Sequence, residues 1–279
     1  QTTQRMVCLV PLGAGRQLII NTESRMTSHL IIPDTQVKDG VDTSHLLAMG
    51  KYIVAHKPDV IICIGDWWDM ESLSAWDRGK LQFEGRRYIN DISSGNEAMD
   101  LMLGPMKRYN QRKAKNKKAR YRPRMIFTLG NHEYRIQRAV ESSGEFQGLM
   151  GYHDLNLKDW EVYDFLEPVE VDGVRYAHYF SNPLTGKPWG GMIDPRLKNI
   201  GYSFTQGHTQ TLLYGRRDLT NGDVINGVVC GAFYSHDEGY KGYQGNNHFR
   251  GFIHKRNVHE GNYDIEIVRL ESLLEDYGE

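Results

Sequence analysis

The sequence predicts an α/β fold in which two stacked, mixed β-sheets are flanked by helices. The first half of the chain alternates short apolar runs with amphipathic segments, as parallel strands and their crossover helices do. The second half is dominated by strand-like segments separated by turn residues. Two of the apolar runs end abruptly on a glycine and polar side chains, which indicates chemistry at the carboxyl ends of strands.

The composition is that of one ordinary globular domain, which we expect to cover residues 1–279. Hydrophobic residues make up 39% and charged residues 25%, and the formal net charge is −1. Attraction to nucleic acid would therefore have to be local. Without a signal peptide or a membrane-length apolar run, we expect a cytoplasmic protein with no membrane partner. Cys8, Cys63 and Cys230 are expected to be buried apolar residues in a reducing compartment.

The chain begins with an expected hairpin or extension over residues 1–28, with short strands at 6–10 and 17–20. Gly13 and Gly15 between them fit a plain turn better than a phosphate loop, because their spacing matches no phosphate-binding motif. A strand at 30–32, a helix at 43–56 and a strand at 60–64 then form a βαβ unit.

The remaining elements follow the same reasoning. Residues 70–95 are expected to be irregular, and 97–110 helical. A strand at 125–129 leads into a helix at 134–142, and Asp172-Gly173 favours a hairpin turn. Residues 181–199 are expected to be a loop. Later strands are predicted at 202–206, 211–214, 224–233, 249–254 and 263–270.

A basic run lies between residues 107 and 124, and no acidic residue interrupts it. It is either a solvated helix end, which positive charge favours, or a patch for the phosphate backbone of DNA or RNA. Because the run leads straight into the strand before Asn131 and His132, both interpretations stay open. Its members are Lys107, Arg108, Arg112, Lys113, Lys115, Lys117, Lys118, Arg120, Arg122 and Arg124.

Side chains that can bind metals follow several of the predicted strands. Taken alone, Asp66 could cap a helix and His132 could be a core histidine. Their recurrence in order at strand ends favours a metal centre instead. A mixture of carboxylate, amide oxygen and imidazole suits divalent metals of intermediate hardness. The candidate set is Asp34, Gln36, Asp66, Asn131, His132, His178, His208 and Gln210.

The order of these motifs resembles the calcineurin-like metallophosphoesterase family. The motifs are Asp-x-Gln at 34–36, Gly-Asp-x-x-Asp at 65–69, Gly-Asn-His-Glu at 130–133, a strand-borne histidine at 178 and Gly-His-x-Gln at 207–210. The resemblance covers residues 31–210. It implies a metal-dependent phosphoric ester hydrolase with an αββα sandwich fold and a two-metal centre between the sheet ends.

The resemblance also implies roles for individual residues. Asp66 would bridge the two metals, and Asp34 would hold the first. The ligands that would complete the second site are Asn131, His178 and His208.

Two further groups complete the implied site. His132 would protonate the leaving oxygen or stabilise the phosphoryl charge, and Glu133 would orient His132. We assign Trp67, Asp69 and Arg135 to substrate binding, although for Trp67 packing beneath its loop is favoured over stacking on a base.

Gln36 and Gln210 stand where the family usually has histidine. By the family pattern both would serve the first metal site. Because an amide oxygen is a neutral, hard donor, this site is expected to be weak, empty or fitted to a harder ion. The second site should hold its ion firmly. Manganese is favoured, with magnesium, zinc or iron as alternatives.

The favoured function is a phosphodiesterase that hydrolyses nucleic-acid or nucleotide diesters with metal-activated water. One alternative is a phosphomonoesterase for a small phosphate or a phosphoprotein. Another is a non-catalytic binding protein of the same fold, which the two glutamines would support.

Overall fold

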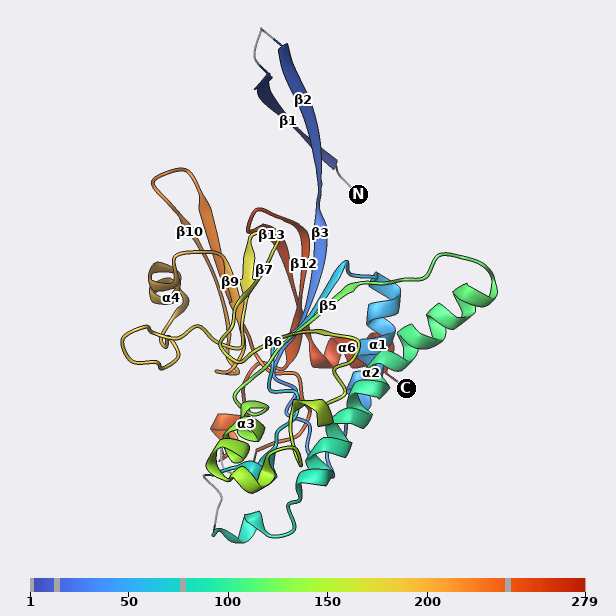
Figure 1. Cartoon of the computed structure of the whole chain (residues 1–279), viewed down its shortest axis with the longest axis vertical. Coiled ribbons are helices and arrows are strands. Elements are labelled where there is room, and N and C mark those ends of the chain that lie inside the picture. Colours follow the sequence, from blue (N-terminus) through green and yellow to red (C-terminus); the bar gives the residue numbers. More distant parts are fainter. Residues whose placement is uncertain (1–2, 13–15, 76–78, 239–241, 279) are drawn as a thin grey trace.

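The computed structural model describes residues 3–12, 16–75, 79–238 and 242–278, with the backbone alone described for 3–25, 82 and 243. Two β-sheets lie face to face, and helices cover their outer sides (Figure 1). The predicted fold class is therefore confirmed. Among the described residues, no helix is long and apolar enough to cross a membrane.

The larger sheet contains six strands in the order β13-β12-β3-β4-β5-β6. Strands β3 to β6 run parallel, while β12 is antiparallel to both β3 and β13. Parallel neighbours have their carboxyl ends at one edge, so polar residues that follow them gather there. The bounds are β3 Thr27–Ile32, β4 Val60–Cys63, β5 Arg124–Thr128, β6 Glu161–Tyr163, β12 Gly251–His259 and β13 Asn262–Arg269.

The smaller sheet contains five strands in the order β10-β11-β9-β8-β7. The predicted hairpin is confirmed, because β7 and β8 pair across a turn in which Asp172 and Gly173 have φ values of 50° and 80°. Both values lie in the left-handed region, as a type I′ turn requires. The bounds are β7 Val169–Val171, β8 Val174–Tyr176, β9 Phe204–Gln206, β10 Leu212–Asp218 and β11 Val224–Cys230.

The alternation of side chains along the central strands builds two separate apolar layers. Ile31, Ile62 and Ile126 point toward the smaller sheet and pack against residues such as Val174 and Val228. Their neighbours along the same strands face the helices of the outer layer. The members of this outer layer include Leu30, Ile61, Phe127, Leu46 and Met102.

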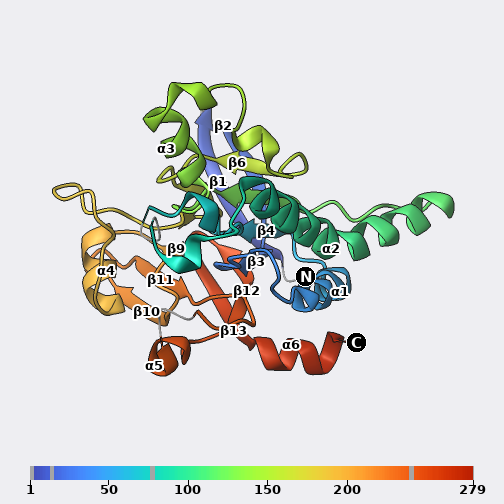
Figure 2. The same cartoon turned by 90° about the horizontal axis from the view of Figure 1, so that it is seen from below.

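The helices cover the outer faces of the two sheets (Figures 1 and 2). α1 and α2 pack together on the larger sheet, and α6 joins them. α4 covers the smaller sheet, where Ile193 and Leu197 meet Phe204. The bounds are α1 Ser44–His56, α2 Tyr88–Lys115, α3 Tyr134–Ser142, α4 Ile193–Ile200, α5 Gly242–Asn246 and α6 Leu270–Tyr277. Single 3-10 turns lie at Glu71–Leu73, Leu81–Phe83, Gly144–Phe146 and Tyr152–Asp154.

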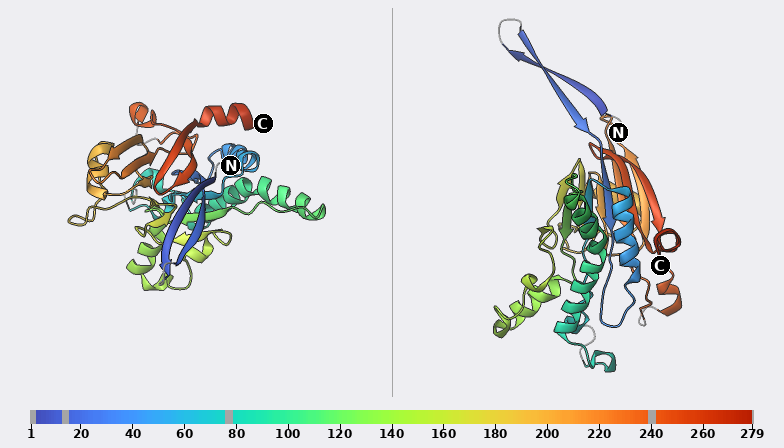
Figure 3. Two further views of the ribbon diagram at one scale, coloured as in Figure 1. Left: turned by 90° about the horizontal axis from the view of Figure 1, so that it is seen from above. Right: turned by 90° about the vertical axis from the view of Figure 1, so that its right-hand side faces the viewer.

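The N-terminal hairpin is confirmed in the backbone. β1 (Thr3–Leu12) pairs antiparallel with β2 (Arg16–Arg25), and the ribbon leads directly into β3. Figure 3 shows this hairpin standing beyond the two sheets. The predicted turn at Gly13 and Gly15 lies outside the described residues, and so does the side chain of Cys8. Cys63 and Cys230 are buried, as expected.

Three helical predictions need correction. α2 begins at Tyr88 and not at 97, so the irregular segment is shorter than expected. Residues 193–200 form α4 inside the segment predicted as a loop. Its Pro195 suggested a loop, yet proline is tolerated in the first turn of a helix. α6 follows the last strand and was not predicted.

Candidate metal and phosphate site

Five strand ends supply the candidate site. Asp34, Asp66 and Asn131 follow β3, β4 and β5 of the larger sheet, while His178 and His208 follow β8 and β9 of the smaller one. Figure 2 views the molecule from this end. Three of these side chains form one cluster, because ligand atoms of Asp66, His178 and His208 all lie within 4.8 Å of one another. The strand pattern and the family resemblance together predicted this convergence.

His178 faces two oxygens across the gap between the sheets. Its Nδ1 donates to the carbonyl oxygen of Ile64 at 2.9 Å, which directs Nε2 toward the site. Nε2 lies 2.9 Å from Oδ1 of Asn131 and 3.3 Å from Oδ2 of Asp66. A nitrogen and two oxygens that converge in this way form a donor set suited to a divalent cation.

Asp34 shows the same need for a cation. It is fully buried, and its Oδ1 accepts a hydrogen bond from the backbone N–H of His208 at 3.1 Å. Its Oδ2 is buried without a hydrogen-bond partner. Buried polar atoms are normally satisfied, so an orphaned carboxylate oxygen beside other ligands indicates a site for a positive charge. The residues present therefore fit a divalent metal.

The motif glycines let the carboxylates approach the backbone. A Cβ on Gly130 would lie 2.1 Å from Oδ1 of Asp66, and a Cβ on Gly207 would lie 2.3 Å from Oδ1 of Asp34. Any side chain at either position would displace a ligand. Both glycines are thus required by the site and not only by a turn.

The titration of the cluster reflects burial and opposite charge. Burial, partly opposed by the neighbouring His178, raises the pKa of Asp34 to about 7. Burial would also raise the pKa of Asp66, yet His132 and His178 hold it well below its usual range. Burial opposes the protonation of His178, but Asp66 raises its pKa to about 9. Burial and then the charge of His178 lower the pKa of His208 to about 4.

The two glutamines line one hollow next to these ligands. The hollow has a volume of ≈ 330 Å³. Gln210 is largely buried, and its Oε1 accepts a hydrogen bond from the hydroxyl of Tyr234 at 2.9 Å. Their shared position agrees with the expectation that they serve the same site. The lining residues are Gln36, Asp66, Asn131, His132, His208, Thr209, Gln210, Thr211, Gly245 and His248.

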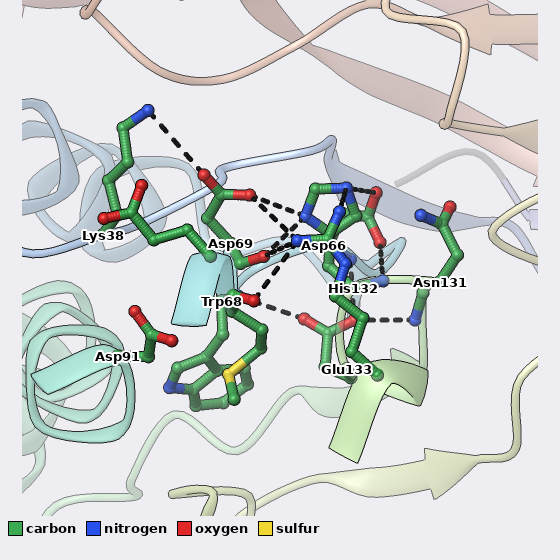
Figure 4. A network of polar contacts seen from close by, with 12 residues as sticks. Lys38, Asp66, Trp68, Asp69, Asp91, Asn131, His132 and Glu133 are labelled. Carbon is green, nitrogen blue, oxygen red and sulfur yellow. Dashed lines mark hydrogen bonds and ion pairs between the residues drawn. The ribbon is translucent and has the colours of Figure 1, made fainter. Parts of the chain in front are cut away.

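His132 is fixed by Asp69 (Figure 4). Its Nδ1 lies 2.8 Å from Oδ1 of Asp69 and 2.8 Å from the backbone carbonyl oxygen of the same residue. Its Nε2 lies 3.6 Å from Oδ2 of Asp66 and 3.1 Å from Nη2 of Arg135. Although burial opposes protonation, Asp66 and Asp69 raise the pKa of His132. Asp69 and Arg135, both predicted to bind substrate, therefore contact the imidazole directly.

Glu133 has a different environment from the one we expected, and it does not contact His132. Its buried carboxylate accepts backbone N–H groups of Asp66 at 2.9 Å, Trp67 at 2.7 Å, Trp68 at 3.1 Å and Gly130 at 2.8 Å. It therefore ties the loop after β4 to the loop after β5. The contact that can orient His132 comes from Asp69.

Trp67 cannot bind substrate, which corrects the prediction. Both Trp67 and Trp68 are fully buried, and the indole N–H of Trp67 donates to the carbonyl oxygen of Gly95 at 3.0 Å. A Cβ on Gly95 would lie 1.9 Å from the ring of Trp68. The two indoles thus hold the loop after β4 against α2, as large apolar side chains usually do.

A further contact at the rim was not predicted from the sequence. Nζ of Lys38 lies 3.7 Å from Oδ2 of Asp69 and donates to Oε1 of Glu238 at 2.8 Å. Nε2 of His236 lies 2.9 Å from the same Glu238 oxygen. The only local signal was the position of Lys38 four residues after Asp34.

Four site residues have backbone conformations in the left-handed region. The φ values are 43° for Gln36, 51° for Asp66, 67° for His208 and 55° for Gln210. Such conformations are uncommon outside glycine, asparagine and aspartate, and they cluster at functional sites. The surrounding fold therefore imposes the directions of these side chains.

The basic run does not reach this site. α2 runs antiparallel to the strands that it covers, so its C-terminal end lies at the opposite edge of the larger sheet (Figure 1). The run leads into the start of β5, whereas Asn131 and His132 follow its end. The run therefore lies away from Asn131 and His132 in space, although it is close to them in the sequence.

A match to a protein-family model agrees with this geometry. A family model described as calcineurin-like phosphoesterase matches residues 30–231, which span all of the candidate ligands. No match is found among curated protein sequences. Yfce, a phosphoesterase from E. coli, is 11% identical with a TM-score of 0.39 and covers 87% of this chain and 99% of its own.

A further solved structure is 14% identical with a TM-score of 0.36, and the match covers 88% of this chain and 100% of that one. Both TM-scores fall below 0.5, so no property of this chain is inferred from either structure.

Proposed function

The chain belongs to the calcineurin-like phosphoesterase family, and from that premise we propose that it is a metal-dependent phosphodiesterase. One ion would be held by Asp66, Asn131, His178 and His208, whose donor atoms converge. A second would be held by Asp34, Asp66, Gln36 and Gln210. A divalent cation supplies positive charge and acidifies water at neutral pH. Every other contribution comes from the side chains of the chain itself.

The charge of the hollow supports a diester over a monoester. Among the described residues that line it, none is lysine or arginine, and the imidazole of His132 is the group with a raised pKa. A diester carries one negative charge, whereas a monoester dianion carries close to two. Beyond the charge that bound cations would supply, the lining adds neutral polar groups such as Asn131, Thr209 and Thr211, which match the smaller charge.

His132 is proposed as the group that handles the leaving oxygen. Asp69 fixes Nδ1, which leaves Nε2 directed toward Asp66 and the hollow. A protonated imidazole in that place can donate to the leaving oxygen and offset the charge that develops there. Arg135 does not line the hollow; its guanidinium lies 3.1 Å from Nε2, and it is proposed to hold the loop that carries Asp69 in place beside the imidazole.

The metal preference of the two positions should differ. The position with His178 and His208 offers two imidazoles, which zinc, iron and manganese accept. The other position offers oxygen ligands, and the Tyr234 hydroxyl already occupies Oε1 of Gln210. Manganese suits both donor sets, which supports it as the working metal. A reducing compartment stays part of this proposal, since Cys63 and Cys230 are both unbridged.

The proposal is tested by comparing bis-p-nitrophenyl phosphate with p-nitrophenyl phosphate, each with Mn²⁺, Zn²⁺ or Mg²⁺. We expect faster hydrolysis of the diester with Mn²⁺ and its loss in His132→Ala. Faster hydrolysis of the monoester would replace the proposal with a phosphomonoesterase. Tight binding of phosphate without turnover of either compound would support a non-catalytic protein.

A further inference from the structure

The end of α2 extends past the core of the protein. The last buried residue of the helix is Met106, yet the helix continues to Lys115 and the chain returns through 116–123 to β5. Figures 1 and 2 show this end projecting beyond the sheets. Packing on the apolar core therefore does not account for the last turns. We call residues 107–122 the basic arm.

Most of the positive charge on the arm has no carboxylate partner among the described residues. Lys107 pairs with Asp100 at 2.7 Å, and Arg124, just beyond the arm, pairs with Glu161 at 2.8 Å. The exposed cations between Lys107 and Arg124 form no ion pair with any described residue. These cations are Arg108, Arg112, Lys115, Lys117, Lys118, Arg120 and Arg122.

The exposed cations have a regular spacing on the helix. Arg108, Arg112 and Lys115 stand at positions i, i+4 and i+7 and so form one stripe along α2. Like charges at this spacing repel one another, which destabilises an isolated helix by a few tenths of a kcal/mol per pair. A bound polyanion would relieve that repulsion.

A groove adjoins the base of the arm. Its volume is ≈ 590 Å³, and its lining includes Arg120, Arg122 and Lys57, together with Arg256, which pairs with Glu266 at 2.6 Å. The single acidic side chain among the described lining residues, Asp59, accepts hydrogen bonds from the backbone N–H and the hydroxyl of Ser28 at 3.0 Å each. The groove is thus a concave, predominantly cationic surface continuous with the arm.

This surface and the proposed active site lie at opposite edges of the larger sheet. Asp59 precedes β4 and lines the groove, while Ile64 follows β4 and accepts the hydrogen bond of His178. Five residues of strand span about 16 Å at 3.3 Å per residue. A small substrate in the active site would therefore not touch the arm.

We propose that the basic arm and its groove bind the sugar-phosphate backbone of nucleic acid. Phosphates at regular spacing match a row of guanidinium and ammonium groups, and this contact needs no base readout. The arm carries no exposed large apolar side chain among the described residues, so it lacks the groups that insert into a lipid surface. The inference deepens the proposed function by naming a polymeric partner, yet binding can be measured without turnover.

The test uses fluorescence anisotropy with a labelled 20-nucleotide DNA strand, its duplex and the matching RNA, in EDTA to prevent cleavage. The variant is Arg108→Glu/Arg112→Glu/Lys115→Glu. We expect at least a tenfold loss of affinity and a shallower salt dependence, by about 0.7 in the slope of log K against log salt for each lost single-strand contact. The relative affinities for the DNA strand, the duplex and the RNA show which nucleic acid the arm prefers.

The matched control is Lys187→Glu/Lys198→Glu/Arg217→Glu, which makes the same charge change at exposed cations elsewhere. Equal loss in both variants, or no loss in the arm variant, would overturn the inference. Binding to anionic phospholipid vesicles but not to any nucleic acid would overturn it as well. Because the arm lies outside the core, the variant should keep the wild-type melting temperature and the wild-type rate on bis-p-nitrophenyl phosphate.

Discussion

Nδ1 of His132 lies 2.8 Å from Oδ1 of Asp69, and the two residues belong to loops that follow different strands. The carboxylate fixes which nitrogen of the imidazole faces the hollow. Burial lowers the pKa of His132, but Asp66 and then Asp69 raise it. The first prediction follows from this pair.

Asp69→Asn should lower kcat on a diester by roughly 10- to 100-fold, with a smaller change in KM, because the general acid loses its ionised partner. Since Asp69 raises the pKa of His132, its replacement should move the alkaline limb of the kcat profile to lower pH. The pH dependence of kcat measures this directly. A variant with the wild-type profile would show that another group donates the proton.

Glu133→Gln should destabilise the fold. The buried carboxylate of Glu133 accepts four backbone N–H groups, and an amide would turn a donor toward at least one of them. Leaving buried groups unsatisfied costs about 1–3 kcal/mol, and more where a charge was involved. Urea unfolding should show a lower free energy of unfolding. Glu97→Gln, at an exposed position, should change it by less than about 0.5 kcal/mol.

Restoring histidine at both glutamines should strengthen a second metal site. In Gln36→His/Gln210→His we expect two tightly bound zinc ions per chain where the wild type keeps one. The hydroxyl of Tyr234, which now donates to Gln210, makes Tyr234→Phe a useful addition. Metal content after dialysis is the measurement, and Gln137→His at an exposed position is the control. An unchanged number of bound zinc ions per chain would show that the two glutamines do not belong to one metal site.

His45 should contribute to acid instability. Burial lowers its pKa to about 4, although Nε2 donates to the carbonyl oxygen of Phe233 at 3.1 Å. The unfolded chain takes up this proton near pH 6.5 and the folded chain only near pH 4. Stability is therefore complete above about pH 6.5 and falls as the pH drops toward 4.

In His45→Gln this loss should be smaller than in the wild type by roughly 1.4 kcal/mol per pH unit within that window. Urea unfolding at several pH values measures the difference. Parallel curves for the two proteins would show that His45 does not titrate differently in the folded state.

Lys38→Met should lower kcat several-fold, because Asp69 and Glu238 would lose the cation between them. Lys38→Arg should recover part of the activity, since it restores the charge. Equal loss in both variants would instead indicate that the shape of the lysine side chain matters. Lys158→Met, at an exposed position, should have no effect on kcat.

The sequence was sufficient where a signal is local and repeated. An apolar strand followed by glycine and a ligand located Asp66 and Asn131, and the order of motifs located His178 and His208. The contacts of Glu133 could not be predicted, because they depend on how two loops are stacked. Lys38 and Glu238 are 200 positions apart and meet only in the folded chain.

The position of the basic run relative to the site could also not be predicted from the sequence. The run is close to Asn131 in the sequence, which suggested that the two are also close in space. The direction of α2 against β5 separates the two by the full length of a strand. Where a helix runs antiparallel to the strand that follows it, residues at the end of the helix lie far from residues that follow the strand.

The left-handed backbone at Gln36, Asp66, His208 and Gln210 has a consequence for how the site responds to its ligands. Each such residue costs of order 1–3 kcal/mol, so the surrounding structure must favour these shapes before any ion arrives. Loading the centre should then require little rearrangement of the loops. The chain trades some resistance to heat for a binding site that is already formed.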